Sequence, residues 1–209
     1  MLKYLIFTLA TCSLMYVNFC CAGFQEGLEA ANKGDFATAL KEWQPLADLG
    51  NPQAQFNLGL MYANGRGVPH DNAKAVHWFR KSAEQGKADA QNSLGWAYKH
   101  GAGILQDFVQ AANWFKKSAR QGAAYGQRGL GCLYRDGKGV PQNPILAYSW
   151  LNLASAGGHP SAARERDIVA RTLTAAELQQ GQQLASSWKM GTLIPEVVYR
   201  PQKNARFRF

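Results

Sequence analysis

The chain has 209 residues, of which 46% are hydrophobic, and this is enough to bury the core of one or two domains. Its formal net charge of +9 would suit nucleic acid, but no zinc-finger or RNP-type motif accompanies the charge. We therefore expect no nucleic-acid partner. The excess of basic residues favours an anionic envelope polymer, lipid head groups or an acidic protein as partner.

The first 22 residues are typical of a secretory signal peptide. Residues 1–3 form a short basic start, residues 4–19 an apolar run, and residues 20–22 have small side chains where signal peptidase cleaves. We expect cleavage after Ala22 or Gly23, and hence an exported protein that is periplasmic or secreted. The apolar run is shorter than the ~20 residues that cross a bilayer. An uncleaved anchor and a lipidated cysteine remain as alternatives.

Cleavage there removes three of the four cysteines and leaves Cys132 alone. Because a single cysteine forms no internal disulfide, packing must stabilise the mature chain. We expect Cys132 to be a small buried residue. An exposed thiol that pairs with another chain is the alternative.

Residues 24–51 contain the second half of a repeating unit. Asp35, Ala39 and Trp43 fall 36 positions before residues of the same kind in the next unit, at Asp71, Ala75 and Phe79. This spacing predicts a partial or capping unit with helices near 24–33 and 36–49.

From residue 52 onward the same residues recur every 36 positions, which is the signature of a repeat architecture. The recurring sets are Leu58, Leu94 and Leu130; Tyr62, Tyr98 and Tyr134; Gly65, Gly101 and Gly137; Gly67, Gly103 and Gly139; Ala75, Ala111 and Ala147; and Trp78, Trp114 and Trp150. Full repeats are therefore expected near 52–87, 88–123 and 124–159.

Each repeat is predicted to form two helices. Ala54, Leu58 and Tyr62 are spaced by four and make one apolar stripe of a first helix. Gly59 beside that stripe costs about 1 kcal/mol of helix propensity relative to Ala, so its recurrence indicates a helix that comes too close for a side chain. The six helices are expected near 52–64, 72–85, 88–100, 108–121, 124–135 and 144–156.

Residues 160–188 begin like a repeat but lose the Leu-Gly pair and the Gly-x-Gly loop, as a capping unit does. Helices are expected near 160–171 and 175–188, the second starting with the capping box Thr174-Ala-Ala-Glu177. Residues 189–209 lose the period and are basic, so we expect a flexible tail whose deletion leaves melting nearly unchanged.

A single helix pair cannot cover its own apolar face, so the units must stack. The predicted fold class is all-α, a right-handed α-solenoid of stacked antiparallel helix pairs with a concave surface.

These repeats resemble the tetratricopeptide-like Sel-1-like repeats. The segment AQFNLGLMYANGRGVPHDNAKAVHWFRKSAEQG carries the likeness, which covers roughly Phe24 to Trp188. Leu105 departs from the proline found as Pro69 and Pro141. The resemblance implies an exported bacterial scaffold for protein or peptide partners, in envelope regulation or host contact. One branch of the family carries a cysteine pair in every repeat and is linked to β-lactams, but this chain lacks those pairs.

We find no residues arranged for catalysis, a cofactor or a metal. The loop Gly65-Arg66-Gly67 follows a helix and recurs in each repeat, so it is a turn and not a phosphate loop. His70 lies beside Asp71 with no nucleophile near it in sequence. No HExxH motif, cysteine pair or carboxylate cluster occurs. We expect the recurring tryptophans to be a core ladder and not a ligand cage.

By analogy with tetratricopeptide solenoids, a partner would contact first-helix residues that vary between repeats. The residues expected there are Phe56, Asn64, Asn92, Trp96, Lys99, Tyr125, Arg128 and Arg135. Aromatic and arginine side chains are frequent binding hot spots. As alternatives, the position shared by Leu60, Trp96 and Cys132 packs between neighbouring first helices, and the two arginines are only solvated charges.

The leading hypothesis is therefore an exported, non-enzymatic scaffold that binds a protein or peptide on its concave face. Two alternatives remain. One is an envelope enzyme or accessory acting on peptidoglycan or β-lactams, and the other is a binder of anionic envelope polymers through the basic tail.

Overall fold

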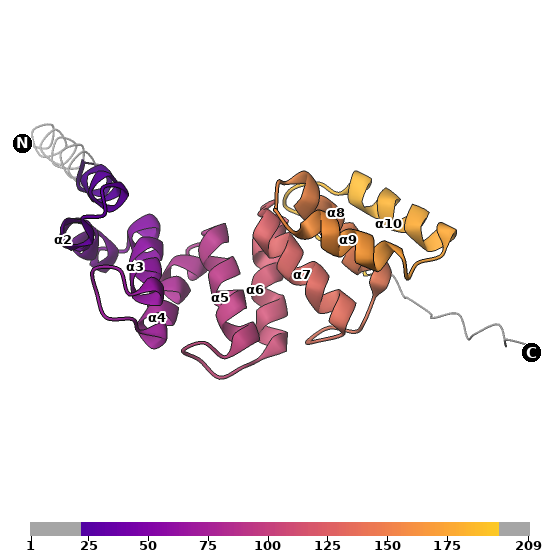
Figure 1. The fold of residues 1–209 in the computed structure, drawn as a ribbon, viewed down its shortest axis with the longest axis horizontal. Coiled ribbons are helices and arrows are strands. Elements are labelled where there is room, and N and C mark those ends of the chain that lie inside the picture. The colour runs from indigo at the N-terminus through magenta and orange to yellow at the C-terminus, as the bar shows by residue number, and fades with distance from the viewer. Residues whose placement is uncertain (1–21, 197–209) are drawn as a thin grey trace, which may run out of the picture. The chain divides into compact units, whose positions relative to one another are not determined.

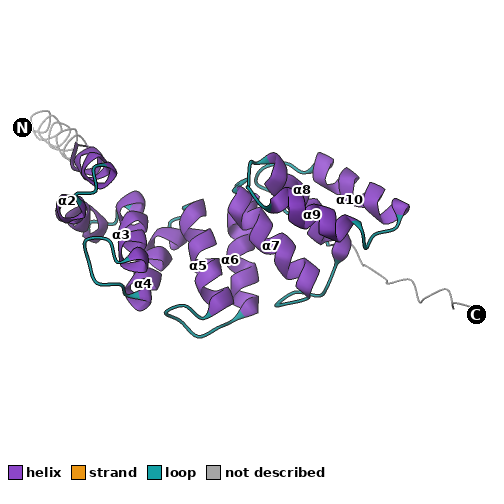
Figure 2. Cartoon of the chain, in the orientation of Figure 1, coloured by secondary structure: helices purple, strands orange, loops and turns teal. Residues whose placement is uncertain are grey.

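The computed structural model describes residues 22–196, which fold into helices joined by turns, with no strand in that range (Figures 1 and 2). A helix covers residues 22–32. The labelled helices are α2 (Phe36–Asp48), α3 (Pro52–Asn64), α4 (Asn72–Glu84), α5 (Ala88–His100), α6 (Phe108–Arg120), α7 (Ala124–Asp136), α8 (Pro144–Ala156), α9 (Ala162–Ala170) and α10 (Ala175–Ser187). The predicted signal segment, except Ala22, and residues 197–209 lie outside the described range.

Most predicted helix bounds hold within a residue or two, and α9 is the clearest difference. Pro160 was expected to open that helix, but residues 160 and 161 form a turn and α9 begins at Ala162. The ring nitrogen Nδ1 of His159 accepts a hydrogen bond from the backbone N–H of Ser161 at 3.2 Å. This contact holds the turn before the helix.

The chain divides into two compact units, which are described separately. The first contains residues 22–90 with 102–104, and the second contains residues 91–101 with 105–196.

Second helices start where the sequence places a short acidic or amide side chain. Asp35, Asp71 and Asp107 each accept a hydrogen bond from a backbone N–H in the first turn, at 3.1, 2.9 and 2.9 Å. Asn143 does the same for Leu146 at 3.0 Å. These side chains satisfy N–H groups that have no partner inside the helix. These four residues are therefore the N-caps of α2, α4, α6 and α8.

The recurring glycine of the first helix lies under an aromatic ring. A Cβ added at Gly59 would lie 2.5 Å from the ring of Phe79, and one at Gly95 would lie 2.8 Å from the ring of Phe115. No real Cβ contact is that short, so glycine is required for the two helices of a repeat to pack at this distance. The prediction of a close helix approach is confirmed.

The helix over residues 22–32 is a first helix of the same kind. Gly27 and Leu28 match Gly59 and Leu60 at a spacing of 32 residues, and a Cβ at Gly27 would lie 2.4 Å from the Trp43 indole. Its loop to α2 is four residues shorter than the later loops. The shorter loop hides this unit from a search at the 36-residue period.

The Gly-x-Gly loops pack on the start of the preceding second helix. The second glycines, Gly67, Gly103 and Gly139, have φ near +70°. A Cβ at Gly67 would lie 2.7 Å from the Cβ of Phe36, and one at Gly139 would lie 2.1 Å from the carbonyl oxygen of Phe108. Both the backbone conformation and the close approach therefore require glycine.

Buried polar side chains connect neighbouring helices. In the first unit Gln55, which is 3% exposed, donates to the carbonyl oxygen of Ala47 at 3.0 Å and accepts from Gln85 at 2.8 Å. In the second unit Gln121 donates to Gln91 at 2.9 Å. These amides satisfy one another, as buried polar groups must.

The recurring tryptophans are core residues, with exposures of 8%, 8% and 1% for Trp78, Trp114 and Trp150. Lys81 lies 4.9 Å above the Trp78 ring and Lys117 lies 3.9 Å above the Trp114 ring. The third tryptophan, Trp150, contacts another aromatic ring: Trp188 packs edge-on against it, with 6.4 Å between the ring centroids.

Residues 188–196 form what we call the C-terminal strap. Gly191 donates its backbone N–H to the carbonyl oxygen of Arg120 at 2.7 Å, and Ile194 is 4% exposed within the core of the second unit. Glu196 contacts both Lys116 at 3.2 Å and the Tyr134 hydroxyl at 3.1 Å. The expectation of a flexible tail from residue 189 is therefore wrong for residues 189–196.

Candidate functional site

Two aromatic side chains stand exposed on first helices of the second unit. Trp96 on α5 is 53% exposed and its ring lies 4.5 Å from the His100 ring. Tyr125 on α7 is 59% exposed and its ring meets His159 edge-on at 4.5 Å. Exposed tryptophan and tyrosine rings are candidates for binding, because these residue types are enriched among the residues that dominate interface binding energy. We call these four residues the aromatic face.

The repeat register places both rings in one stripe. Tyr125 falls at the position of Asp89, which is seven residues before Trp96 on its helix. Residues seven apart lie on the same side of a helix, about 10 Å from each other along its axis. The aromatic face therefore presents its two rings on neighbouring first helices at different heights.

Both histidines of the aromatic face are held neutral at pH 7. Burial lowers the pKa of His100, and the nearby charge of Lys99 lowers it further. Burial and the charge of Arg128 lower the pKa of His159, and they outweigh the opposite effect of Glu165. The exposed His100 ring therefore adds to the aromatic surface without adding charge, whereas His159 is buried and packs edge-on against Tyr125.

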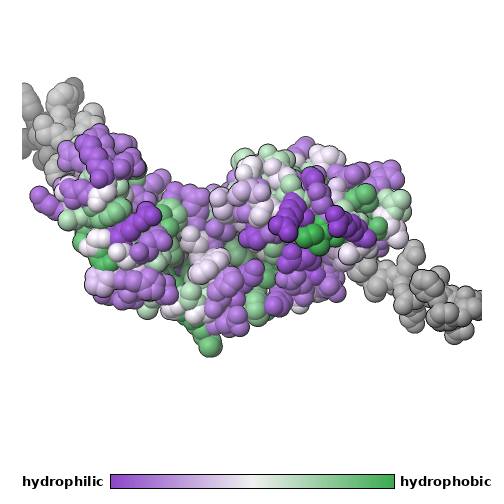
Figure 3. Space-filling view, in the orientation of Figure 1, coloured by the Kyte–Doolittle hydropathy of each residue, from purple (hydrophilic) through white to green (hydrophobic). Residues whose placement is uncertain are grey.

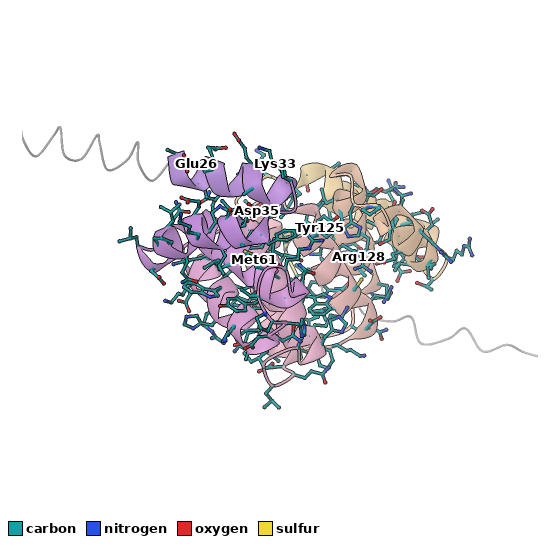
Figure 4. The ribbon with its side chains drawn as sticks, turned by 60° about the vertical axis from the view of Figure 1, so that its left-hand side comes forward. Glu26, Lys33, Asp35, Met61, Tyr125 and Arg128 are labelled. Carbon is teal, nitrogen blue, oxygen red and sulfur yellow. The ribbon has the colours of Figure 1, made fainter. Side chains whose placement is uncertain are left out.

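Arg128 is occupied by an ion pair inside the unit. Its guanidinium donates to both carboxylate oxygens of Glu165 on α9, with Nε at 2.9 and 3.2 Å. The thiol of Cys132 and the hydroxyl of Ser161 donate to the same carboxylate at 3.0 and 3.2 Å. Figure 4 labels Arg128 and Tyr125, which lie one turn apart on α7. This cluster fastens α9 to α7.

Burial and hydrogen bonding act on the pKa values of Glu165 and Cys132 in this cluster. Burial raises the pKa of Glu165, but the hydrogen bonds from Arg128, Cys132 and Ser161 outweigh burial and leave the pKa below its usual value. Burial, together with the hydrogen bond to Glu165, raises the pKa of Cys132 to about 11. Cys132 is 2% exposed, so the expectation of a buried residue is confirmed, although its thiol also donates a hydrogen bond.

The other residues predicted in the second unit are partly covered. Arg135 pairs with its neighbour Asp136, with Nε 2.7 Å from Oδ1. Asn92 and Lys99 are half-buried. Of the four polar residues predicted on α5 and α7, the two arginines are therefore already engaged by carboxylates of the chain.

In the first unit Phe56 does not present a free ring. It packs against Phe79 at 5.8 Å, and the amine of Lys87 lies 5.1 Å from its centroid. Asn64 is exposed, and its side-chain amide donates to the carbonyl oxygen of Leu60 at 2.8 Å. Leu60 itself is 37% exposed.

Asn64 and Leu60 also border a pocket of about 120 Å³ in the first unit. The pocket lies between the helix over residues 22–32, α2 and α3. The sequence singled out Asn64 but not the other polar residues there, Asn57 and Arg66. No periodic signal marks them, because the positions 36 residues later hold Ser93 and Ala102.

Within residues 22–196 no three His, Cys, Asp or Glu side chains gather closely enough to hold a metal ion. None of the helices in that range has both the length and the hydropathy needed to span a membrane. Most of the surface seen in Figure 3 is hydrophilic.

Comparison with known proteins places these repeats in a family. The model of the Sel1 repeat matches residues 52–87, 88–122 and 124–159, together just over half of the chain. A crystal structure of a Sel1 repeat protein from Oxalobacter formigenes is 28% identical with a TM-score of 0.66, covering 75% of this chain and 68% of that one. The protective antigen c5321 of uropathogenic Escherichia coli, with an SLR fold, is 29% identical with a TM-score of 0.56, covering 79% and 44%.

Two curated mammalian proteins share one short segment with the chain. DAP3-binding cell death enhancer 1 from Rattus norvegicus is 44% identical over 50 residues, and its counterpart from Mus musculus is 42% identical over 50 residues. The match covers 24% of this chain and 10% of either relative. Sel1 repeat proteins are generally non-catalytic scaffolds for protein–protein contact. The repeats, their helix pairs and these structural likenesses together show that the chain belongs to the Sel1 repeat family.

Proposed function

We propose that the protein is an exported, non-enzymatic scaffold that binds a protein or peptide segment through first-helix residues. The observation that carries the proposal is the aromatic face, where Trp96 and Tyr125 are 53% and 59% exposed. Tryptophan and tyrosine are enriched among the residues that dominate binding energy at protein interfaces. Family membership supports a protein partner, since Sel1 repeats serve as interaction scaffolds.

Ion pairs within the chain make two of the predicted binding residues less available to a partner. Arg128 and Arg135 are engaged by Glu165 and Asp136, so a partner carboxylate would have to displace an existing pair. Displacing a bidentate pair costs more than covering an exposed ring. The proposed contact therefore rests on Trp96 and Tyr125, while Arg128 fastens α9 to α7, the helix that carries Tyr125.

Export is the second part of the proposal, and the basic start and apolar run of residues 1–22 support it. Cleavage after Ala22 or Gly23 would keep Phe24, whose carbonyl oxygen accepts the Trp43 indole N–H at 3.2 Å. Mass spectrometry of the protein recovered from the native envelope tests this directly. We expect a chain beginning at Gly23 or Phe24, and a full-length or lipid-modified chain would contradict it.

Site-specific photocrosslinking in living cells tests the binding proposal. A photoreactive amino acid replaces Trp96 or Tyr125, and in the control chain it replaces Asn113, an exposed residue of the second helix α6. We expect a discrete crosslinked product from the first two positions and none from the third. The captured protein should then fail to co-purify with the Trp96→Ala/Tyr125→Ala variant.

The opposite pattern would reject the aromatic face as the binding surface. Crosslinks that arise only at Asn113, or a captured partner that still co-purifies with the double variant, would move the contact elsewhere. Circular dichroism of the double variant is the necessary control. Both replaced rings are more than half exposed, so we expect its helix content to match that of the native chain.

A further inference from the structure

The pocket in the first unit has the features of a receptor for one apolar side chain. Its apolar walls come from three helices: Ala31 from the helix over 22–32, Phe36 and Trp43 from α2, and Leu60 and Met61 from α3. An apolar cavity of about 150 Å³ holds a benzene-sized molecule. A pocket of about 120 Å³ therefore suits a single aliphatic side chain such as Leu, Ile or Met.

Two asparagines with unused hydrogen-bonding groups line the same pocket. Asn57 makes no side-chain hydrogen bond within residues 22–196, and Asn64 uses only its amide N–H, which leaves its carbonyl oxygen free to accept. A side-chain amide carries both donors and an acceptor, so it can pair with the N–H and C=O of a peptide backbone. The two asparagines thus favour an extended peptide over a simple hydrocarbon.

Arg66 is the one charged side chain that lines the pocket. Its guanidinium lies 5.5 Å from the centroid of the Phe36 ring, and no carboxylate of the described residues lies within ion-pair distance of it. Stacking on an aromatic ring holds the guanidinium in place and leaves its donors open. A held but unpaired cation beside an apolar pocket is complementary to an apolar residue with a neighbouring acid.

We propose that this pocket receives one large aliphatic side chain from an extended peptide segment of a partner protein, and that a carboxylate within two residues of that side chain pairs with Arg66. The proposal rests on the scaffold function proposed above and adds a recognition rule for the partner. It does not require the aromatic face and the pocket to bind the same segment.

The second unit offers a matched control for Arg66. Lys138 occupies the same place in its Gly-x-Gly loop, 72 residues later, and its amine lies 5.3 Å from the centroid of the Phe108 ring. Charge reversal there changes net charge and loop chemistry in the same way as Arg66→Glu. Because Lys138 lines no part of the pocket, Lys138→Glu should leave recognition intact.

The probe is a displayed library of random 12-residue peptides, selected on the native chain and counter-selected on an Ala31→Met/Arg66→Glu variant. Methionine at position 31 fills the pocket from its own wall, and glutamate at position 66 repels the acid. We expect the enriched peptides to share a Leu, Ile or Met followed or preceded within two residues by Asp or Glu. A selection that enriches no such pattern overturns the proposal.

A synthetic peptide from that selection is then titrated by fluorescence anisotropy. We expect Arg66→Glu and Ala31→Met each to weaken binding at least tenfold and Lys138→Glu less than twofold. Replacing the peptide acid by its amide should weaken binding to the native chain but not to Arg66→Glu. Equal losses from Arg66→Glu and Lys138→Glu would reduce the effect to net charge and overturn the proposal.

Methionine methyl resonances give a local readout that folding defects would not imitate. Of the chain's four methionines, Met61 lines the pocket and Met190 lies in the strap. Peptide binding should shift the Met61 methyl signal and leave the Met190 signal in place. If the peptide instead loses affinity for Trp96→Ala/Tyr125→Ala and still binds Ala31→Met, the pocket proposal fails while the scaffold function stands.

Discussion

Gly59 and Gly95 define the distance between the two helices of a repeat by having no side chain. The ring of Phe79 lies where the Cβ of residue 59 would be, and the ring of Phe115 covers Gly95 in the same way. Glycine weakens each first helix by about 1 kcal/mol relative to Ala. The close packing that it permits must therefore contribute more than that penalty to each repeat.

Gly59→Ala should destabilise the protein although alanine is the better helix former. Overpacking a core by one carbon typically costs about 1–3 kcal/mol, and the added Cβ would lie only 2.5 Å from the Phe79 ring, so we expect a cost near the upper end of that range. The propensity gain offsets about 1 kcal/mol, which leaves a net loss of about 2 kcal/mol. Urea unfolding followed by circular dichroism measures it. Adding Phe79→Leu should recover part of the loss, giving a favourable coupling between the two changes. Strictly additive losses would contradict a direct clash.

The carboxylate of Glu165 makes the packing of α9 depend on pH. Its pKa is lower in the folded chain, because the hydrogen bonds from Arg128 and its neighbours outweigh burial. A lowered carboxyl pKa gives stability that is complete above the unfolded value of ~4.3 and is lost as pH falls through the folded value. The Arg128–Glu165 pair is therefore a stabilising contact at neutral pH and not at strongly acid pH.

Glu165→Gln should cost about 1–2 kcal/mol at pH 7, because it leaves the half-buried Arg128 without its counter-charge. The difference in unfolding free energy between the two proteins should shrink as the pH falls below the unfolded value of ~4.3 and through the lower folded pKa of Glu165, because the native carboxylate then becomes neutral as well. Urea midpoints across this range supply the comparison. A difference that stays constant with pH would show that Glu165 acts through packing alone.

At the scale of elements, the last helices and the strap close the second unit in different ways. The Ser149 hydroxyl on α8 donates to the carbonyl oxygen of Gly181 at 3.0 Å, which ties α10 to the repeat before it. Trp188 of the strap packs edge-on against Trp150, whereas lysine amines lie over Trp78 and Trp114 in the earlier repeats. Ile194 of the strap belongs to the same buried core cluster as Trp150.

A chain that ends at Lys189 should melt at a lower temperature than a chain that ends at Glu196. Burying Ile194 contributes about 1.5–3 kcal/mol, and the remaining strap contacts roughly offset the entropy of ordering it. We expect a net loss of about 2 kcal/mol, or about 4–8 °C in melting temperature, with little change in helix content. Equal melting temperatures for the two chains would show that the strap adds nothing.

The sequence predicts regular elements well and particular contacts poorly. Helix bounds and caps follow from periodicity and from residues such as Asp71, because both depend on neighbours within one turn. The Arg128–Glu165 pair joins residues that are 37 positions apart on two different helices. No sequence motif marks the two residues as partners. The strap was missed because its apolar residues Met190, Leu193 and Ile194 follow no helical period. The pocket was missed because its lining runs from Ala31 to Arg66 over three helices, and contacts between such distant residues leave no local signal.

At the scale of the whole molecule, stability is built from contacts between neighbouring elements of a repeating chain. Polar links such as Gln85 to Gln55 and Gln121 to Gln91 each span 30 residues. Such chains behave as a sum of repeat stabilities and nearest-neighbour terms. No contact of this kind needs a fixed number of repeats, so the repeat, and not the chain length, is the unit that must stay intact.

Deleting residues 88–123, one full period, should therefore leave a folded protein. The deletion places Arg80 and Glu84 where Lys116 and Arg120 stood, so the strap again meets a cation and a helix-end carbonyl group. We expect unchanged mean residue ellipticity, cooperative unfolding and a modestly lower melting temperature. Deleting only residues 88–105 removes α5 and keeps α6, which leaves a second helix without its first-helix partner. That shorter deletion should unfold most of the following repeat, and if it proves as stable as the longer one, the 36-residue unit does not govern folding.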